Sequence, residues 1–508
     1  MSKKPNIIYI MCDQFRFDCI EALGNSKIRT PNLNRLVERG VTFTNAYTNV
    51  PVCVAARYTE RTGRDCYNTG SYRNGGLFPD KRLPENMEER CGEYLPRTLK
   101  KNGYRTFGIG KFHSRPFFEE MGYDVHLHVE EVWGNPEQRN GDAFAKYIKE
   151  EHPAFAYIEQ LHGERTDMYY MPQISPLPAH LTAEAFVTDK TIEIIEKTPL
   201  DTPYFSFVSY VGPHPPCAPP IPYNRMYNPD YMDAPIKTDI GIDHMDEQLP
   251  YMNHYIWAEQ INEFGAKHVK ARYYGEISYI DEQIGRILDA VEKRGDGDNT
   301  LIAFFTDHGD HLGDHNAWQK ESYFEQSAHI PFLVSLPSRL QAGTKNDELV
   351  SIVDLFGIAT NAADCLEIRD GIDVLGMVEG KEEPREYLFH AFGRPGTKDF
   401  KFMARKGDYK YIFMANGDRE QLFNIKTDPN ESVLLNEKEK DILTELKNYG
   451  TKFCDRVGLD AALADKETLK VFEYTPIEKK RVHQFDQSAG ITDFTITFGE
   501  GGDCDATY

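Results

Sequence analysis

Cys53 has the side chain of a nucleophile, and Arg57 has the side chain of a cation that could bind the group under attack. Their spacing would allow them to act together. They lie four residues apart within residues 51–64, so in a helix they would share one face. If Cys53 opens that helix, its side chain lies where free backbone N–H groups and the helix dipole favour anions. Taken alone, the pair is equally consistent with a buried structural cysteine.

Four polar residues follow two apolar runs and offer ligands for a metal ion: Asp13, Gln14, Asp307 and His308. The runs, 6–11 and 300–305, have the pattern of buried parallel strands. Three oxygen-bearing side chains and one histidine suit a hard divalent cation, which leaves calcium, magnesium and manganese open. Either aspartate alone could instead be an ordinary loop or capping residue.

Four more residues could bind an anion or transfer a proton: Lys111, His113, His214 and Lys320. Three of them follow further strand-like runs, at 104–109 and 204–211. A lone histidine is usually structural. Lys320 is a candidate for anion binding only because it follows the Asp307 loop. Because 80 acidic residues oppose 58 basic ones, an anion site in this chain needs its own local cations.

The elements that must position these residues alternate along the chain. Apolar runs typical of strands occur at 6–11, 41–49, 104–109, 204–211, 300–305 and 330–337. Segments with helical spacing lie between them, at 31–40, 93–102, 182–197, 267–294 and 351–366. This order predicts an α/β fold with a large, mostly parallel sheet flanked by helices. The carboxyl ends of its strands would bring the polar residues together.

The sequence pattern changes near residue 380. Short runs at 400–405, 409–414 and 420–425, separated by Gly- and Asn-containing turns, predict an antiparallel meander, and 435–453 predicts a helix packed on it. We therefore expect a catalytic domain over 1–380 and a C-terminal α+β subdomain over 381–473. The polar tail, 474–508, has one late strand at 491–498 and is expected to be an arm that contacts another subunit.

Composition narrows the classes of partner. A formal charge of -22 argues against nucleic acid and anionic membranes. The nine scattered cysteines suit free thiols in a reducing compartment better than a disulfide framework. The N-terminal apolar run is too short for a signal peptide or a membrane span, so we expect a cytoplasmic protein with no membrane contact.

Several motifs, in order, resemble those of the sulfatase family in the alkaline-phosphatase-like superfamily. The nucleophile motif Cys-x-Pro-x-Arg, followed by Thr-Gly-Arg, is similar to residues 53–57 and 62–64. The Gly-Lys-x-His, Pro-His and Ser/Thr-Asp-His/Asn-Gly motifs are similar to 110–113, 213–214 and 306–309, with Lys320 as the downstream lysine. The C-terminal stretches 406–411 and 422–424 resemble the family's meander. The resemblance covers about the first 430 residues and implies an alkaline-phosphatase-like fold.

This resemblance implies a role for each residue. Cys53 would be oxidised by a formylglycine-generating enzyme to an aldehyde, whose hydrate attacks sulfur and then collapses to release sulfate. The metal, with calcium favoured and manganese or magnesium as alternatives, would be bound by Asp13, Gln14, Asp307, His308 and modified Cys53. The substrate side would consist of Arg57 to orient the hydrate, Lys111 and Lys320 to bind sulfate, His113 as base, and His214 with Lys320 to protonate the leaving oxygen. Asn74 matches a substrate-side position of the phosphonate-hydrolase branch.

Two positions depart from the family pattern. Ala55 replaces the usual proline, which leaves open which maturation machinery accepts the site. Gln14 replaces a second aspartate, and residues 13–18 are similar to the phosphonate and phosphodiester hydrolase branch. The main prediction is a sulfatase acting on a small sulfated carbohydrate or aryl sulfate, and the alternative is a phosphonate monoester or phosphodiester hydrolase. A non-catalytic anion-binding relative is a third reading, and a mutase is disfavoured because Cys53 stands where such enzymes use Ser or Thr.

Overall fold

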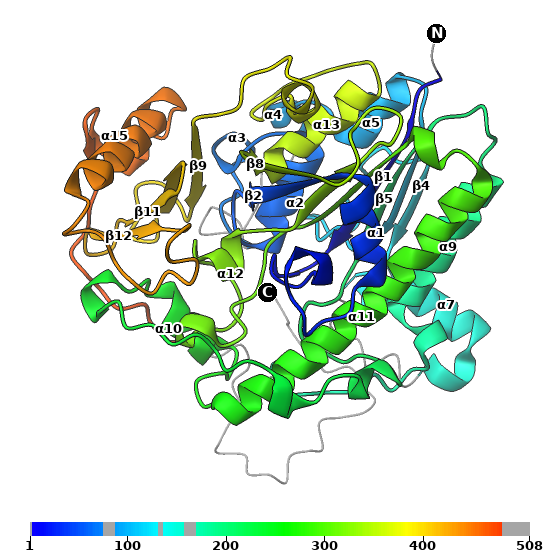
Figure 1. Cartoon of the computed structure of the whole chain (residues 1–508), viewed down its shortest axis with the longest axis horizontal. Helices are drawn as coiled ribbons and strands as arrows, with labels where there is room; N and C mark the ends of the chain where they lie inside the picture. The colour runs from blue at the N-terminus through cyan, green and yellow to red at the C-terminus, as the bar shows by residue number, and fades with distance from the viewer. Residues whose placement is uncertain (1–2, 75–86, 131–135, 157–168, 480–508) are drawn as a thin grey trace.

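The structure is a computed structural model that describes residues 3–74, 87–130, 136–156 and 169–479 (Figure 1). The predicted late strand at 491–498, and the tail beyond residue 479, lie outside the described residues. A large sheet with helices on both faces forms the centre of Figure 1, and a smaller sheet with one long helix lies to its left. This arrangement confirms the predicted fold class.

The large sheet has eight strands in the order β4-β3-β5-β1-β6-β7-β2-β8. Their bounds are β1 Asn6–Cys12, β2 Val41–Tyr47, β3 Arg105–Gly110, β4 Val125–His128, β5 Tyr204–Tyr210, β6 Thr300–Thr306, β7 Phe332–Ser335 and β8 Thr344–Ser351. Strand β1 is parallel to both its neighbours, β5 and β6, and only β7 runs antiparallel to the strands beside it. The carboxyl ends of β1, β3, β5 and β6 therefore meet at one edge of the sheet.

Alternate residues of β1 enter different cores, as a strand buried on both faces requires. Ile8 and Ile10 pack in a cluster with α1 (Pro31–Arg39), α9 (Ala183–Lys197) and α11 (Glu263–Arg294). The opposite face, which begins with Ile7 and Tyr9, packs against three other helices: α2 (Cys53–Thr62), α5 (Leu95–Lys101) and α13 (Leu355–Ala362). The central strand is thus held rigidly, together with the residues that follow it.

The smaller sheet is antiparallel, in the order β12-β11-β10-β9. Its strands are β9 Tyr387–Phe392, β10 Lys401–Lys406, β11 Tyr409–Met414 and β12 Arg419–Asn424, and α15 (Lys440–Arg456) packs on β10 and β11. A third core joins Phe402 and Tyr411 of this sheet to Val52 and Ala55 at the start of α2. The smaller sheet and the segment that carries Cys53 therefore share one hydrophobic core.

The structure differs from the predicted elements in three places. Strand β4, with four residues, and strand β8, whose first five residues alternate between exposed and half-buried, were not predicted. The expected helix at 351–366 is a short 3-10 turn, Ile352–Asp354, followed by α13. A capping box between Ser351 and Asp354 satisfies N–H groups at the start of this turn.

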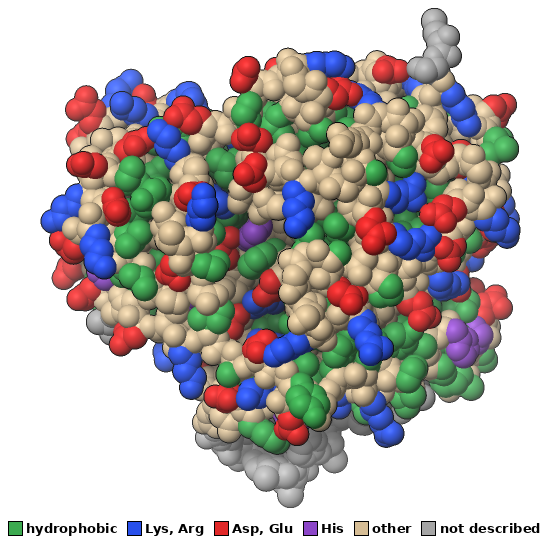
Figure 2. All heavy atoms as spheres, in the orientation of Figure 1, with side chains coloured by type: hydrophobic (Ala, Val, Ile, Leu, Met, Phe, Trp, Pro, Cys, Tyr) green, Lys and Arg blue, Asp and Glu red, His purple; other side chains and the backbone are tan. Residues whose placement is uncertain are grey.

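Charged side chains of both signs are interspersed over the face shown in Figure 2, so the net charge is spread across that face rather than gathered in one patch. Over the described ranges, no helix combines the length and the apolar character that crossing a bilayer requires.

Candidate active site

Cys53 is the first residue of helix α2, so it shares one helix face with Arg57. Val52 precedes the helix with extended backbone (φ -151, ψ 146), and the helix ends at Gly63 with φ 63. A Cβ at position 63 would lie 2.7 Å from the Cβ of Phe356. Glycine is thus required here both by the left-handed backbone and by the close packing, which explains the Thr-Gly-Arg pattern after the helix.

The Cys53 thiol is fully buried among three polar groups. Its Sγ lies 3.1 Å from His308 Nε2 and 3.6 Å from Asp13 Oδ1, and Lys320 Nζ donates to it over 3.2 Å. Burial, and then the Asp13 carboxylate, raise the pKa of this thiol above its ordinary value. Unmodified Cys53 is therefore a neutral thiol rather than a reactive thiolate at neutral pH.

Four buried side chains place one possible ligand atom each within 4.8 Å of one another: Asp13, Cys53, Asp307 and His308. The Oδ2 atom of each carboxylate forms an ion pair with a cationic side chain. Asp13 Oδ2 lies 2.6 Å from Lys111 Nζ and 3.1 Å from Arg57, whose Nε lies 3.0 Å from Asp307 Oδ2. The two remaining oxygens each lie 3.8 Å from His308 Nε2.

These residues fit a hard divalent cation. Two ligand atoms that each bind one ion at 2.0–2.6 Å lie roughly 3–4 Å apart, which is the spacing of the two carboxylate oxygens from the imidazole nitrogen. His308 Nδ1 lies 3.0 Å from Gly309 O, so it donates there and leaves the Nε2 lone pair facing the carboxylates. The pattern of donors supports the sequence-based prediction of a metal centre at this sheet edge.

The electrostatics keep these ligands in their metal-binding protonation states. Burial opposes ionisation of Asp13, but the surrounding positive charges, Lys111 foremost, hold its pKa well below the usual range. Burial also lowers the pKa of His308, to about 4, against the opposing effect of Asp307. At neutral pH the carboxylate is therefore charged and the imidazole is neutral.

Lys320 Nζ contacts three polar groups next to Cys53. Its three ammonium protons have three acceptors: Gln14 Oε1 at 2.9 Å, Cys53 Sγ at 3.2 Å and His214 Nε2 at 3.0 Å. His214 Nδ1 lies 2.8 Å from Pro215 O and donates to it, which makes Nε2 the acceptor for Lys320. The lysine and the histidine form one proton-sharing pair beside the thiol.

The backbone around Lys320 is strained. Gln319 (φ 70) and Glu321 (φ 74) both occupy the left-handed region, which costs energy for residues with a Cβ. The Glu321 N–H donates to Pro51 O over 3.1 Å, and its carbonyl accepts from Lys401 Nζ over 2.5 Å. The smaller sheet, through Lys401, thus helps hold the conformation that directs Lys320 at Cys53.

Gln14 borders the metal ligands from a left-handed position (φ 64). Its backbone N–H donates to Asp307 Oδ1 over 3.1 Å, while its side-chain oxygen accepts from Lys320. Its amide nitrogen donates to buried Asp310 Oδ2 over 2.6 Å. Gln14 therefore lies beside the metal-binding group with its side-chain oxygen directed at Lys320, and its role as a metal ligand stays a prediction.

The end of β3 delivers two of the predicted residues. Gly110 has φ 118, and a Cβ there would lie 1.8 Å from Ser209 O, so only glycine allows the chain to leave the sheet here. Lys111 then reaches Asp13, and the His113 N–H (φ 47) donates to both carboxylate oxygens of Glu130. His113 Nδ1 is buried and has no hydrogen-bond partner among the residues that the structure describes. Burial, then Lys111, push its pKa well below the usual value.

Asn74 lies at the N-terminus of α2. Its Oδ1 accepts from the Val54 N–H over 3.0 Å, one residue after Cys53, and so caps one of the free N–H groups of the helix. Among the described residues its amide nitrogen has no partner, so the side chain has a donor left beside the nucleophile. This position agrees with the substrate-side role that the resemblance implies.

Three supporting residues were missed by sequence reasoning. Ser209 accepts from Arg57 Nη1 over 3.0 Å, and Asp310 accepts from Gln14. Glu130 holds the loop that carries His113. Ser209 was visible as a hydroxyl inside an apolar strand, and Asp310 as an acid next to the Asp307 motif, but Glu130 follows the unpredicted strand β4 and gave no such signal.

Comparisons with known proteins agree with this geometry. The family model "Sulfatase" matches residues 5–364, and "N-sulphoglucosamine sulphohydrolase, C-terminal" matches residues 313–453. The chain is 30% identical to the arylsulfatase of Clostridium perfringens, over 86% of this chain and 91% of that one. It is 26% identical to the choline-sulfatase of Rhizobium meliloti, over 95% and 93% of the two chains.

A solved structure shares the fold. The phosphonate monoester hydrolase of Agrobacterium radiobacter superposes with a TM-score of 0.75 at 22% identity, over 90% of this chain and 96% of that one. The fold and the site together define a hydrolase of the alkaline-phosphatase-like superfamily. Within it, the chain belongs to the sulfatase family, whose members hydrolyse sulfate esters.

Proposed function

We propose that this protein hydrolyses a sulfate monoester of a small carbohydrate or aryl alcohol, with formylglycine at position 53 and one divalent cation. The observation that carries the proposal is the position of Cys53 Sγ, which lies within 3.6 Å of His308, Asp13 and Lys320. An aldehyde hydrate at this position would share its surroundings with the metal ligands and with the cations that receive sulfate.

Formylglycine and the cation, calcium by preference, would supply a hydroxyl nucleophile with a lowered pKa. Residues of the chain would bind the sulfate and transfer the protons. Lys111 and Lys320 present positive charge to the sulfate oxygens, and Arg57 holds both aspartates in place through its two ion pairs. His214, bonded to Lys320, lies where a proton can pass to the leaving oxygen. His113, which its lowered pKa keeps neutral, is the proposed base.

The class of substrate is supported by charge and by relatives. The C-terminal region matches the family model named for N-sulphoglucosamine sulphohydrolase, and the Clostridium relative is named an arylsulfatase. The net charge of -22 disfavours a polyanionic polymer, so we propose a mono- or oligosaccharide, or an aryl sulfate, rather than an intact sulfated polysaccharide.

Mass spectrometry of the peptide across residues 51–57, from the native host, tests the nucleophile. Formylglycine replaces CH₂SH by CHO and lowers the peptide mass accordingly, and Ala55 makes the identity of the maturation enzyme part of the question. The same preparation is then assayed for sulfate release from aryl and sugar sulfates. Modified protein that releases no sulfate from any of them would refute the proposal.

Phosphonate monoester or phosphodiester hydrolysis is the second candidate. Gln14 favours it, because a neutral amide stands where many sulfatases have an aspartate, which lowers the negative charge near the metal by one. Paired aryl substrates that differ only in a sulfate, phosphodiester or phosphonate group separate the two. Rates on the phosphorus esters far above the sulfate rate would establish the second candidate instead.

The cellular location and the partners of the enzyme are also proposals. The eight described cysteines are all free, which suits a reducing cytoplasm, and we propose no nucleic-acid or membrane partner. The tail, 474–508, is proposed to contact a second copy of the chain. Cell fractionation tests the first point, and light scattering of the full chain and of a chain ending at residue 479 tests the second.

A further inference from the structure

Asp310 is a buried acid next to the candidate active site, and the proposed reaction steps do not use it. Its side chain is fully buried, and three groups donate to it. Oδ1 accepts from the Leu312 N–H over 2.8 Å, while Oδ2 accepts from the Tyr170 hydroxyl and from the Gln14 amide nitrogen, each over 2.6 Å. Burial raises the pKa of this carboxyl, but three converging donors require the carboxylate form, which only accepts.

The side-chain amide of Gln14 connects Asp310 to Lys320. On one side its nitrogen donates to the Asp310 carboxylate, and Gln319 Oε1 is a second acceptor at 3.3 Å. On the other side its oxygen accepts from Lys320 Nζ over 2.9 Å. A reversed amide would place its oxygen against a carboxylate and its NH₂ group against an ammonium. The acid and the lysine therefore fix a single orientation for this amide.

Tyr170 connects Asp310 to the backbone of the Lys320 loop. Its hydroxyl donates to Asp310 and accepts from the Gln319 N–H over 3.0 Å. Gln319 directly precedes Lys320 and has the left-handed conformation described above, with φ 70. Asp310 thus contacts the lysine loop by two routes, one through the Gln14 side chain and one through Tyr170.

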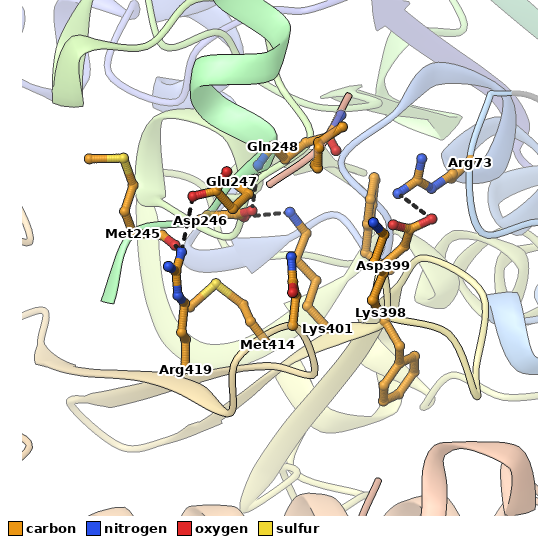
Figure 3. Close-up of a pocket in the computed structure, with 14 residues that line it drawn as sticks. Arg73, Met245, Asp246, Glu247, Gln248, Lys398, Asp399, Lys401, Met414 and Arg419 are labelled. Carbon is orange, nitrogen blue, oxygen red and sulfur yellow. Dashed lines mark hydrogen bonds and ion pairs between the residues drawn. The ribbon is translucent and has the colours of Figure 1, made fainter. Parts of the chain in front are cut away.

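The smaller sheet holds the other side of the same loop. Lys401, which Figure 3 shows directed at Asp246, also donates to the carbonyl of Glu321, the residue after Lys320. These contacts fix the backbone on both sides of Lys320. A lysine side chain has a flexible four-carbon stem, however, so the direction of its ammonium group depends on the acceptors that it finds.

We propose that Asp310 is a positioning residue that acts through the Gln14 amide, directs Lys320 at Cys53, and requires a neutral side chain at position 14. The inference rests on the proposed sulfatase function and deepens it, because Lys320 is proposed there to bind sulfate. Asp310 keeps the amide oxygen turned towards the ammonium group. A second acid at position 14 would instead bring two buried carboxylates into contact, which like charges disfavour.

A cycle of variants at positions 14 and 310 tests this coupling by urea unfolding with a chelator present. Gln14→Glu should lower the urea midpoint of the wild type, because it places a second carboxylate against Asp310. In the Asp310→Asn background the same change should raise the midpoint, since the new carboxylate can accept from the introduced amide and from Lys320. An acid with a purely structural role could not be rescued from position 14. A Gln14→Glu chain that folds only together with Asp310→Asn is the extreme form of the expected result.

The matched control is Asp314→Asn, which removes another buried acid of the same loop. Asp314 Oδ2 lies 2.9 Å from Arg16 Nη1, and its Oδ1 accepts from the Ile236 N–H over 2.8 Å, so it has no bond to Gln14. In the Asp314→Asn background, Gln14→Glu should lower the urea midpoint as it does in the wild type, because Asp310 is still an acid.

Two further measurements follow the coupling to the metal-binding group and to catalysis. Calorimetric titration of chelator-treated protein with calcium should show about 10–100-fold weaker binding in Asp310→Asn than in the wild type, the usual size for a residue that orients a metal-binding side chain. With formylglycine at position 53, kcat/KM on an aryl sulfate should fall by a similar factor in Asp310→Asn. Most of that loss should be recovered in the double variant with Gln14→Glu.

The results separate this inference from the proposed function. Urea midpoints that add across the cycle would overturn the inference, and so would wild-type calcium affinity and kcat/KM in Asp310→Asn. If the wild type binds no calcium, or releases no sulfate when it carries formylglycine, the proposed function fails instead. The urea cycle uses neither the metal nor formylglycine, so it then still decides whether Asp310 holds the Gln14 amide.

Discussion

Protonation of His308 makes the stability of the metal-free enzyme depend steeply on pH. Burial lowers the pKa of this imidazole to about 4, whereas in the unfolded chain it titrates near 6.5. Between these two values the unfolded chain binds a proton that the folded chain does not, so the free energy of unfolding falls as pH falls. The loss is about 2 kcal/mol between pH 7 and pH 5, and about 3 kcal/mol once the pH is below 4.

Urea unfolding at pH 7 and pH 5, with a chelator present, measures this loss. His308→Gln removes the titrating group, so its stability should fall by about 2 kcal/mol less than that of the wild type over the same interval. His315→Gln is the matched control, because His315 is also buried with a pKa lowered to about 4, but it bonds to Thr238 and Gln326 rather than to the metal ligands. Both variants should flatten the pH dependence, and only His308→Gln should weaken the stabilisation by calcium. A wild-type pH dependence in His308→Gln would refute the reasoning.

Three further outcomes follow from the buried charges. Arg57→Met is expected to cost about 3–5 kcal/mol of unfolding free energy in chelator, because Asp13 and Asp307 lose their shared cation. Calcium should recover part of that loss. A cost below about 1 kcal/mol in urea unfolding would contradict this prediction. Lys410→Met should cost a similar amount, since it strips the cation that lies 2.7 Å from Glu325 and 2.6 Å from Glu431, but calcium should not change this loss. For the wild type, a chelator should lower the midpoint of thermal unfolding, and added calcium should raise it as its concentration rises, which differential scanning calorimetry can measure. A midpoint that neither changes would argue against a structural role for the metal.

Sequence patterns predicted the parts of this molecule that are determined by short stretches of chain. The buried strands before Asp13 and Asp307 are continuous apolar runs, and their ends place the polar residues that follow them. Strand β8 escaped prediction because its polar first half gains its order from pairing with β2, some 300 residues away in sequence. Contacts of this kind, like that between Lys401 and Glu321, leave no local pattern, so the support of the site by the smaller sheet needed the three-dimensional structure.

The strain at Lys320 explains how the smaller sheet contributes to the candidate active site. Two neighbouring residues in the left-handed region cost of order 1–3 kcal/mol each, so the loop keeps this shape only if other contacts hold it. Those contacts come from Pro51, at the start of the nucleophile segment, and from Lys401 on the smaller sheet. The position of Lys320 is therefore set jointly by the segment that carries Cys53 and by strand β10 of the smaller sheet, and a change at Lys401 should be felt at Cys53.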